Sequence, residues 1–247
     1  MELLPSVSIL TPVYNRNKFL PLMKCNIQHF AYPKDKLEWV ILDSLSKDGD
    51  EAEPLFKSKQ EVEIASRELG IPINYKYERS ALSIGKKRNM LVKMARYNHL
   101  INLDSDDIYF PHYITYSIRT LIDNKYGLVG SPGMLFVFPN DNYKMAGIQC
   151  GALRQVHEAT MAFTKKHWKR MGGFDSSSRG EGAAMIDGCS EKIFGKTDIT
   201  KLMICVCGDQ NTISKDRFLE EQHLIKGVDY NNLKEIPQIK VLKEIFK

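Results

Sequence analysis

The sequence has few cysteines, and their spacing forms no recognisable pattern. Five occur among the 247 residues: Cys25, Cys150, Cys189, Cys205 and Cys207. An odd number without paired zinc spacing argues against both a disulfide framework and a structural zinc site. We therefore expect reduced thiols, as in a cytosolic compartment.

Long apolar runs are missing as well. No stretch reaches the roughly 18 consecutive apolar residues that a transmembrane helix needs. Residues 1–6 lack the basic segment followed by an apolar one that marks a signal peptide. The expectation is a cytoplasmic protein without a transmembrane span.

Charge of one sign is not concentrated anywhere. The net charge is +5, and the lysines and arginines are scattered without a basic block or interleaved aromatic stripe. No nucleic-acid partner is expected, although a mild positive balance suits a phosphate-bearing substrate. Repeats and low-complexity segments are also absent. The hydrophobic fraction of 43 % is ordinary and provides for a sizeable core.

Strand and helix patterns alternate through the first half of the chain. Apolar runs predict strands over 7–11, 37–42, 73–77 and 100–103, with helices over 19–30, 55–69 and 83–97 between them. This rhythm predicts an α/β fold with a mostly parallel central sheet and helices on both faces. The second half is mixed, with helices over 114–122, 165–171 and 232–245 and short strands over 128–129, 134–138, 161–163 and 202–206.

An acidic turn follows the fourth predicted strand. Asp104, Asp106 and Asp107 come directly after the apolar run 99–103. Open α/β sheets bind ligands at the carboxyl ends of their strands. Asp104 and Asp106 would share a hard cation there, since oxygen-only ligands favour Mg²⁺, Mn²⁺ or Ca²⁺ over zinc. The alternative is an acidic turn that caps the next helix, with Pro111 just inside it.

Several motifs occur together and in order. They are 7–16 (Val-Ser-Ile-Leu-Thr-Pro-Val-Tyr-Asn-Arg), 39–44 (Trp-Val-Ile-Leu-Asp-Ser), 85–89 (Gly-Lys-Lys-Arg-Asn), 104–106 (Asp-Ser-Asp), 172–175 (Gly-Gly-Phe-Asp) followed by Glu181, and Asn211-Thr212. With this set the chain resembles the family 2 glycosyltransferases, inverting enzymes of the GT-A fold with a DxD motif. The resemblance implies one Rossmann-like GT-A domain over 1–247, with a nucleotide-binding half (6–107), an acceptor-side half (108–218) and a C-terminal helical tail (219–247).

The resemblance implies a nucleotide site built from several strand ends and one helix. Its residues are Thr11, Pro12, Tyr14 and Arg16 in the first loop, Asp43 for the base, Lys87 and Arg88 for the phosphates, and Asp104 and Ser105 in the acidic turn. Simpler roles stay open, among them a helix cap for Asp43, loop packing for Tyr14 and a solvated helix face for Arg88. Asp43-Ser44-Leu45-Ser46 departs from the usual Asp-Asp-Gly-Ser, which leaves the base less defined.

The metal and the catalytic base are also implied by the resemblance. Asp106 is expected to bind Mn²⁺ or Mg²⁺, with Asp104 shared between ribose and metal and Asp209 in place of a customary histidine. Glu181 is the first candidate for the base that takes the acceptor proton, and Asp187 is the second. The surrounding Gly180-Glu181-Gly182 replaces the usual Glu-Asp. An acid that faces a helix dipole is the alternative for Glu181.

The sequence thus predicts a metal-dependent inverting glycosyltransferase. It would move a sugar from a nucleotide sugar, with UDP as the expected carrier, to a hydroxyl of a glycan or other acceptor. The alternatives are a nucleotidyltransferase of nucleotide-sugar synthesis and a non-catalytic nucleotide- or sugar-binding module. Residues 11–16 contain no glycine, which argues against the nucleotidyltransferase. The sugar, the acceptor, the oligomeric state and a peripheral membrane contact through the lysine-bearing terminal helix are left open.

Overall fold

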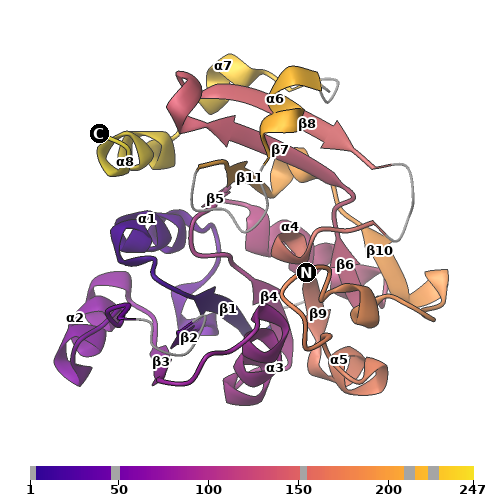
Figure 1. Ribbon diagram of the computed structural model, residues 1–247. Helices are drawn as coiled ribbons and strands as arrows, with labels where there is room; N and C mark the ends of the chain where they lie inside the picture. The colour runs from indigo at the N-terminus through magenta and orange to yellow at the C-terminus, as the bar shows by residue number, and fades with distance from the viewer. Residues whose placement is uncertain (1–3, 46–50, 151–154, 209–214, 222–227) are drawn as a thin grey trace.

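The strands of the first half lie side by side in a large sheet (Figure 1). The computed structural model describes residues 4–45, 51–150, 155–208, 215–221 and 228–247. Within them the sheet has seven strands in the order β10-β6-β9-β4-β1-β2-β3. Their bounds are β1 Val7–Val13, β2 Leu37–Ser44, β3 Ile73–Glu78, β4 His99–Asn102, β6 Leu128–Gly130, β9 Ala162–Thr164 and β10 Phe194–Lys196.

This sheet is mostly parallel. β1 pairs in parallel with β2 and β4, β2 with β3, and β6 with β10. Only β9 runs antiparallel to its neighbours β4 and β6 within the sheet. The predicted α/β fold with a large, mostly parallel central sheet is therefore confirmed.

Helices cover both faces of the sheet, which explains why its central strands are buried and mostly apolar. All eight residues of β2 are buried. Leu37, Trp39 and Ile41 face a core shared with α1, α2 and α4, while Val40 and Leu42 face a second core shared with α3 and α5. A strand buried on both faces reads as a continuous hydrophobic run, as the 37–42 segment does. The helices are α1 Leu20–His29, α2 Lys59–Leu69, α3 Ile84–Met94, α4 Tyr113–Asp123, α5 Lys165–Met171, α6 Asp216–Glu221, α7 Tyr230–Leu233 and α8 Pro237–Ile245.

A second, four-stranded sheet packs above the first (Figure 1). Its order is β5-β11-β7-β8, with bounds β5 Ile108–Tyr109, β7 Gly133–Phe138, β8 Lys144–Gln149 and β11 Met203–Val206. The sequence prediction omitted β5, β8 and β10. These strands are short or contain a glycine, so their sequences lack the apolar run on which the prediction depended.

Helix boundaries differ from the prediction at three places. The helix expected from residue 55 begins at Lys59, where Ser58 caps it by accepting a hydrogen bond from Glu61 N. The helix expected to reach residue 97 ends at Met94. The terminal helix expected over 232–245 is broken into α7 and α8, and α8 starts with Pro237. Proline has no N–H to donate and disfavours helical geometry in the residue before it, so the helix restarts there.

The terminal helix α8 packs inward. Ile239 and Leu242 are fully buried, and the helix contacts α1. None of the helices in the described residues is long and apolar enough to cross a membrane.

Candidate active site

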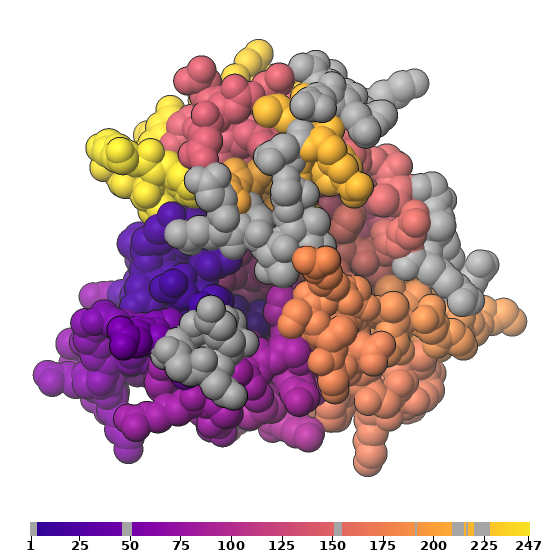
Figure 2. All heavy atoms as spheres, viewed as in Figure 1, coloured from indigo at the N-terminus to yellow at the C-terminus, as the bar shows by residue number. Residues whose placement is uncertain are grey.

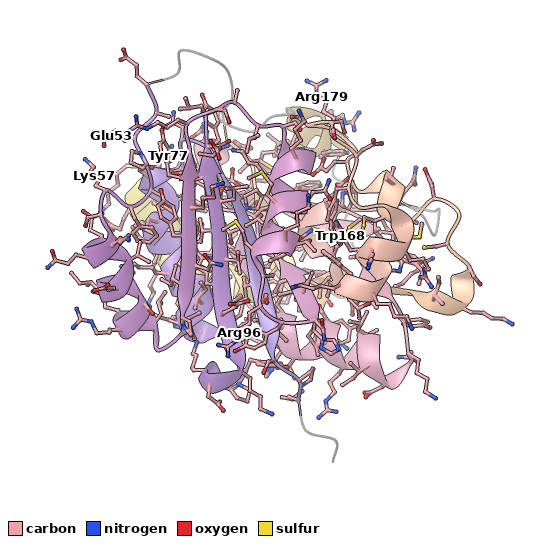
Figure 3. All side chains as sticks on the ribbon, turned by 90° about the horizontal axis from the view of Figure 1, so that it is seen from below. Glu53, Lys57, Tyr77, Arg96, Trp168 and Arg179 are labelled. Carbon is pink, nitrogen blue, oxygen red and sulfur yellow. The ribbon has the colours of Figure 1, made fainter. Side chains whose placement is uncertain are left out.

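A pocket of about 580 Å³ opens where the carboxyl ends of the parallel strands meet the second half of the chain. In the space-filling view the surface is hollowed where the indigo and purple N-terminal half meets the orange segment after α5 (Figure 2). Tyr77, near the end of β3, and Arg179, which lines the pocket, lie at the same end of the sheet (Figure 3). Arg96 lies at the opposite end. The pocket thus occupies the position at which open α/β sheets bind ligands.

The acidic turn lines this pocket, and hydrogen bonds to buried groups of β5 and β11 fix its position. Tyr109 hydroxyl accepts a hydrogen bond from Asp104 N at 2.8 Å. Asp107 Oδ1 accepts one from Val206 N of β11 at 2.9 Å, and Asp107 is buried. Asp104, Ser105 and Asp106 line the pocket as well. The turn therefore joins the two sheets and presents Asp104 and Asp106 to the cavity.

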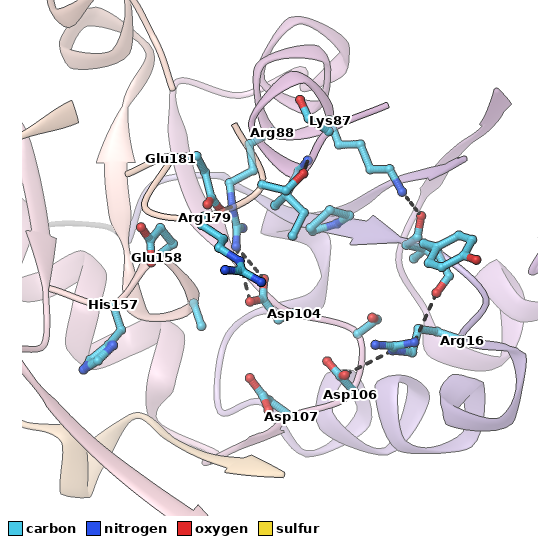
Figure 4. Close-up of a pocket in the computed structure, with 18 of the residues that line it drawn as sticks. Arg16, Lys87, Arg88, Asp104, Asp106, Asp107, His157, Glu158, Arg179 and Glu181 are labelled. Atoms are coloured by element: carbon cyan, nitrogen blue, oxygen red, sulfur yellow. Dashed lines mark hydrogen bonds and ion pairs between the residues drawn. The ribbon is translucent and has the colours of Figure 1, made fainter. Parts of the chain in front are cut away.

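Two arginines pair with the carboxylates of the turn (Figure 4). Arg16, from the loop after β1, places Nε 3.1 Å from Asp106 Oδ2. Arg88, on α3, places Nη2 3.0 Å from Asp104 Oδ1. Partial burial raises the pKa of Asp106, against the lowering effect of the Arg16 charge.

Arg88 also binds the proposed base. Its Nε lies 2.9 Å from Glu181 Oε1, so one guanidinium joins Asp104 to Glu181. Arg88 is only 3 % exposed, and its Nη1 is buried without a hydrogen-bond partner among the described residues. Burial acts to lower the pKa of Arg88, but the charges of Asp104 and Glu181 outweigh it and raise the pKa above its ordinary value. The guanidinium is therefore a permanent cation at the centre of the site.

Lys87 lies on the same turn of α3 and is also buried. Its Nζ donates to Val13 O at 2.5 Å and to Ser44 O at 3.3 Å, across the ends of β1 and β2. Burial lowers the pKa of Lys87 to about 8, against the raising effect of Asp43. The neighbouring Lys86 is exposed. Lys87 lines the pocket together with Pro12 and Tyr14 from the first loop.

Glu181 reaches the pocket because its loop docks closely on the start of α3. Gly85 N donates to Ser177 O at 2.9 Å, and Asp175 N donates to Glu181 O at 3.0 Å. A Cβ at Gly85 would lie 1.6 Å from Asp175 O, so only glycine allows this approach. The 85–89 and 172–181 motifs, which are far apart in the sequence, are therefore in direct contact in the fold.

Two residues of the predicted nucleotide site lie elsewhere. Thr11 is buried, and its Oγ1 accepts from Trp39 Nε1 at 2.8 Å. Asp43 Oδ2 accepts from Leu55 N at 2.8 Å and from the Tyr75 hydroxyl at 3.1 Å, and burial raises the pKa of Asp43. Neither residue lines the pocket.

The second candidate base and the proposed third metal ligand are also away from the described site. Asp187 is exposed and does not line the pocket. Asp209 lies outside the described residues, as do Asn211 and Thr212.

One acidic residue of the pocket was missed by the sequence reasoning. Glu158 lies beside Glu181, and its Oε1 accepts a hydrogen bond from Gly182 N at 3.1 Å (Figure 4). His157 and Arg179 line the same part of the pocket. Residues 157 and 158 belong to no predicted motif, so only the tertiary structure brings them to the site.

The donor atoms of the acidic turn fit a hard divalent cation. Among the described residues no three His, Cys, Asp or Glu side chains gather into a metal-binding group. Asp104 and Asp106 nevertheless present oxygen-only donors to one cavity. Mg²⁺ is commonly held by one or two carboxylates together with substrate phosphates and water. The pair therefore fits a cation that binds together with a diphosphate.

Comparisons with known proteins agree with this architecture. The sequence matches the family described as Glycosyl transferase family 2 over residues 8–175. No curated protein matches the chain.

Several solved structures are similar in fold. S. aureus TarS 1-349 in complex with UDP has a TM-score of 0.60 and 14 % identity, covering 82 % of this chain and 61 % of that one. Its complex with UDP-GlcNAc has a TM-score of 0.59 and 15 % identity, covering 87 % and 64 %. Mannosyltransferase PcManGT from Pyrobaculum calidifontis, in complex with GDP-Man and Mn²⁺, has a TM-score of 0.59 and 18 % identity, covering 98 % and 68 %. This chain spans about three fifths of the length of the TarS fragment (60 %). At these identities the likeness is one of fold, and it agrees with the predicted GT-A architecture.

Proposed function

Because the chain belongs to glycosyl transferase family 2, we propose that it transfers a sugar from a nucleotide sugar to an acceptor hydroxyl, with inversion and with a divalent cation. A UDP-sugar is the first choice of donor, and a glycan or another hydroxyl compound is the acceptor. The observation that carries the proposal is the buried Arg88, which joins the carboxylate proposed to bind the metal to the carboxylate proposed as base.

The first loop and α3 would bind the nucleotide diphosphate. Arg16 and Lys87 line the pocket beside the acidic turn, with Tyr14 near them. Positive groups at the start of a helix suit a phosphate. Asp43, near the end of β2, remains our candidate for the base-recognition residue, and its carboxylate accepts hydrogen bonds from Leu55 N and the Tyr75 hydroxyl.

Asp106 and Asp104 would hold Mn²⁺ or Mg²⁺, with Asp209 as the proposed third ligand. A cation there acts as a Lewis acid and neutralises the charge that develops on a departing diphosphate. In the described structure Arg16 and Arg88 neutralise the same two carboxylates. Both arginines therefore lie where they would meet the phosphates.

Glu181 would take the proton of the acceptor hydroxyl. The acceptor oxygen forms a bond to the anomeric carbon as the bond from that carbon to the diphosphate oxygen breaks, and the diphosphate retains the electron pair. Attack from the face opposite the leaving group inverts the anomeric centre. Asp187 is the weaker candidate because it is exposed and outside the pocket lining.

The test is slow hydrolysis of donors, in which water replaces the unidentified acceptor. UDP-glucose, UDP-GlcNAc and GDP-mannose are incubated with the protein and Mn²⁺, and free sugar is measured. We expect turnover with at least one donor, loss of turnover with a chelator, and loss in Asp106→Ala. Asp123→Ala is the matched control, because Asp123 lies at the exposed end of α4, away from the pocket.

Nucleotide binding is measured in the same variants. Asp106→Ala with unchanged turnover and unchanged Mn²⁺-dependent UDP binding would refute the metal assignment. Glu181→Gln should keep UDP binding and lose turnover. Retained turnover in Glu181→Gln would transfer the role of base to another carboxylate.

A further inference from the structure

Glu158 is a second glutamate in the pocket, next to the proposed base. We infer that Glu158 and Glu181 act as a pair. Glu158 positions Glu181, and it adds a carboxylate whose negative charge the single cation Arg88 does not neutralise. The inference rests on the proposed glycosyl transfer and adds a residue to its site. It starts from how firmly the fold holds Glu158.

Buried hydrogen bonds anchor the short 3₁₀ turn Glu158–Thr160 to the strand that leads into the acidic turn. Asn102 Nδ2, at the end of β4, donates to Glu158 O at 2.7 Å. The hydroxyls of Tyr109 and Tyr113 each donate to Ala159 O at 3.2 Å. All three donors belong to buried residues. Tyr109 also holds Asp104 N, so Glu158 and Asp104 share one rigid support.

The Glu158 side chain in turn holds the loop that carries Glu181. Its Oε1 accepts from Gly182 N at 3.1 Å, one residue after Glu181. A Cβ at Gly182 would lie 2.6 Å from Glu158 Cγ, so glycine is required for this approach. Glu158 therefore fixes the backbone from which Glu181 projects towards Arg88.

The charges around Arg88 do not balance without a further positive charge or a proton. Arg88 makes ion pairs with Asp104 and Glu181, and Glu158 is a third carboxylate near the same guanidinium. Burial and the charge of Glu181 raise the pKa of Glu158, against the lowering effect of Arg88. Three carboxylates against one guanidinium leave an excess of negative charge, which favours a proton on Glu158, the carboxyl whose pKa is raised.

Other charged groups near the pair do not change this balance. Burial, with the Lys215 charge, lowers the pKa of His157 to about 4, so His157 is neutral near pH 7. Arg179 is exposed to solvent, which screens its charge. Arg88 is therefore the buried cation that acts on both glutamates.

The reaction needs such a proton acceptor. As the acceptor oxygen bonds to the anomeric carbon and the diphosphate leaves with its electron pair, the hydroxyl proton passes to a carboxylate oxygen of the pair. The negative charge of Glu158 opposes the effect of the Arg88 cation on the neighbouring Glu181 carboxylate, which favours proton transfer to the pair. Two carboxylates beside one arginine keep proton affinity while the arginine keeps the geometry.

The experiment compares Glu158→Gln with wild type in donor hydrolysis across pH. Glutamine keeps an oxygen that accepts from Gly182 N but removes the charge. We expect kcat to fall about 10²-fold, with KM and Mn²⁺-dependent UDP binding little changed. The acid limb of the kcat profile should move to lower pH, because the remaining base has lost its like-charged neighbour. The double variant with Glu181→Gln should be scarcely worse than the worse single variant.

Two controls separate a role in proton transfer from a role in folding. Glu63→Gln, on the exposed face of α2, should match wild type. Glu158→Ala removes the contact with Gly182 as well, and it should raise KM or lower the melting temperature in addition. An acid limb of Glu158→Gln at the wild-type pH, or a fall in kcat explained by lost UDP binding or lost stability, would overturn the inference. A wild-type protein that hydrolyses none of the donors would instead refute the transfer activity, and this inference with it.

Discussion

At the scale of single residues, the pocket is built from buried charges that lie next to one another along α3. Arg88 remains charged because Asp104 and Glu181 face it directly. The charge of Lys87 is neutralised less completely, because its ammonium group donates hydrogen bonds to the backbone carbonyls of Val13 and Ser44. The two neighbours therefore differ in how their charge responds to pH, since burial lowers the pKa of Lys87 to about 8.

This difference predicts a pH dependence of nucleotide binding. A diphosphate favours the charged amine, so UDP affinity should fall as pH rises through about 8. Lys87→Met should weaken UDP binding at pH 7 by about tenfold and remove that fall. Binding is measured by calorimetry from pH 6.5 to 9.5 in the presence of Mg²⁺.

Lys86→Met is the matched control, because Lys86 is the exposed neighbour on the same helix. It should bind UDP as wild type does at every pH. The sign for stability is the opposite of that for binding. The folded protein holds fewer protons at Lys87 than the unfolded chain between about pH 8 and the ordinary lysine value, so this residue makes stability rise with pH there.

At the scale of elements, the contact between α3 and the 172–181 segment organises the site. Asn89 makes two hydrogen bonds to this segment and a third to α5. Its Oδ1 accepts from Trp168 Nε1 at 2.8 Å and from Phe174 N at 2.9 Å, and its Nδ2 donates to Phe174 O at 2.8 Å. A Cβ at Gly173 would lie 2.6 Å from Asn89 Oδ1. The motif Arg88-Asn89 thus combines a charged group for the pocket with a clamp for the loop that carries Glu181.

Loss of the clamp should destabilise the fold and loosen the site. Asn89→Ala leaves the Trp168 and Phe174 N–H groups without their partner, and we expect a loss of about 2–4 kcal/mol in the free energy of unfolding. Urea denaturation measures it. Asn74→Ala is the control, because Asn74 is exposed and its side chain donates one hydrogen bond, to Met94 O, among the described residues. A loss in Asn89→Ala no larger than in Asn74→Ala would contradict the clamp.

The strands that could be predicted from the sequence are those with a continuous run of apolar residues. β1, β2 and β4 are buried on both faces and read as apolar runs. β10 is three residues long with a glycine at its centre, and its place in the sheet depends on pairing with β6. A strand defined by its partner has no local pattern by which it can be recognised.

The site shows the same division between local and tertiary information. Arg16, Asp106 and Glu181 lie in or next to the motifs that occur in order along the sequence, and the structure brings all three to one pocket. Thr11 and Asp43 stand at strand ends too, but their side chains bind Trp39 and Leu55 instead of lining it. Side-chain direction at a strand end depends on neighbouring elements, which a motif does not specify.

Glu158 could not be inferred locally. Its backbone oxygen binds Asn102, which is 56 positions away in the chain, and its carboxylate binds Gly182 N, 24 positions away. A glutamate in a segment without strong periodicity has no sequence signal. Its importance becomes visible only through the residues that hold it in place.

At the scale of the whole molecule, the C-terminal helix ties the end of the described chain to its beginning and to the site. The apolar residues Ile239 and Leu242 of α8 are fully buried, and α8 contacts α1. Gln238 Nε2 donates to Tyr109 O at 3.2 Å, and the Tyr109 hydroxyl holds Asp104 N. One support therefore runs from α8 to the acidic turn, and we propose that the described parts of the chain unfold as a unit.

This arrangement predicts how a mutation far from the pocket behaves. Leu242→Ala removes a fully buried side chain from the contact between α8 and α1 and should lower the free energy of unfolding by about 2–5 kcal/mol. Because α8 contacts α1 of the first half and Gln238 binds Tyr109 of the second, calorimetry should show one transition, moved as a whole to lower temperature. Lys240→Ala, on the exposed side of α8, should leave the melting temperature unchanged. A second transition in Leu242→Ala, with the nucleotide-binding half melting at its wild-type temperature, would show that α8 does not couple the halves. UDP with Mn²⁺ should raise the whole transition in both variants, by about 2.7 kcal/mol at a hundred times Kd, since neither substitution touches the pocket.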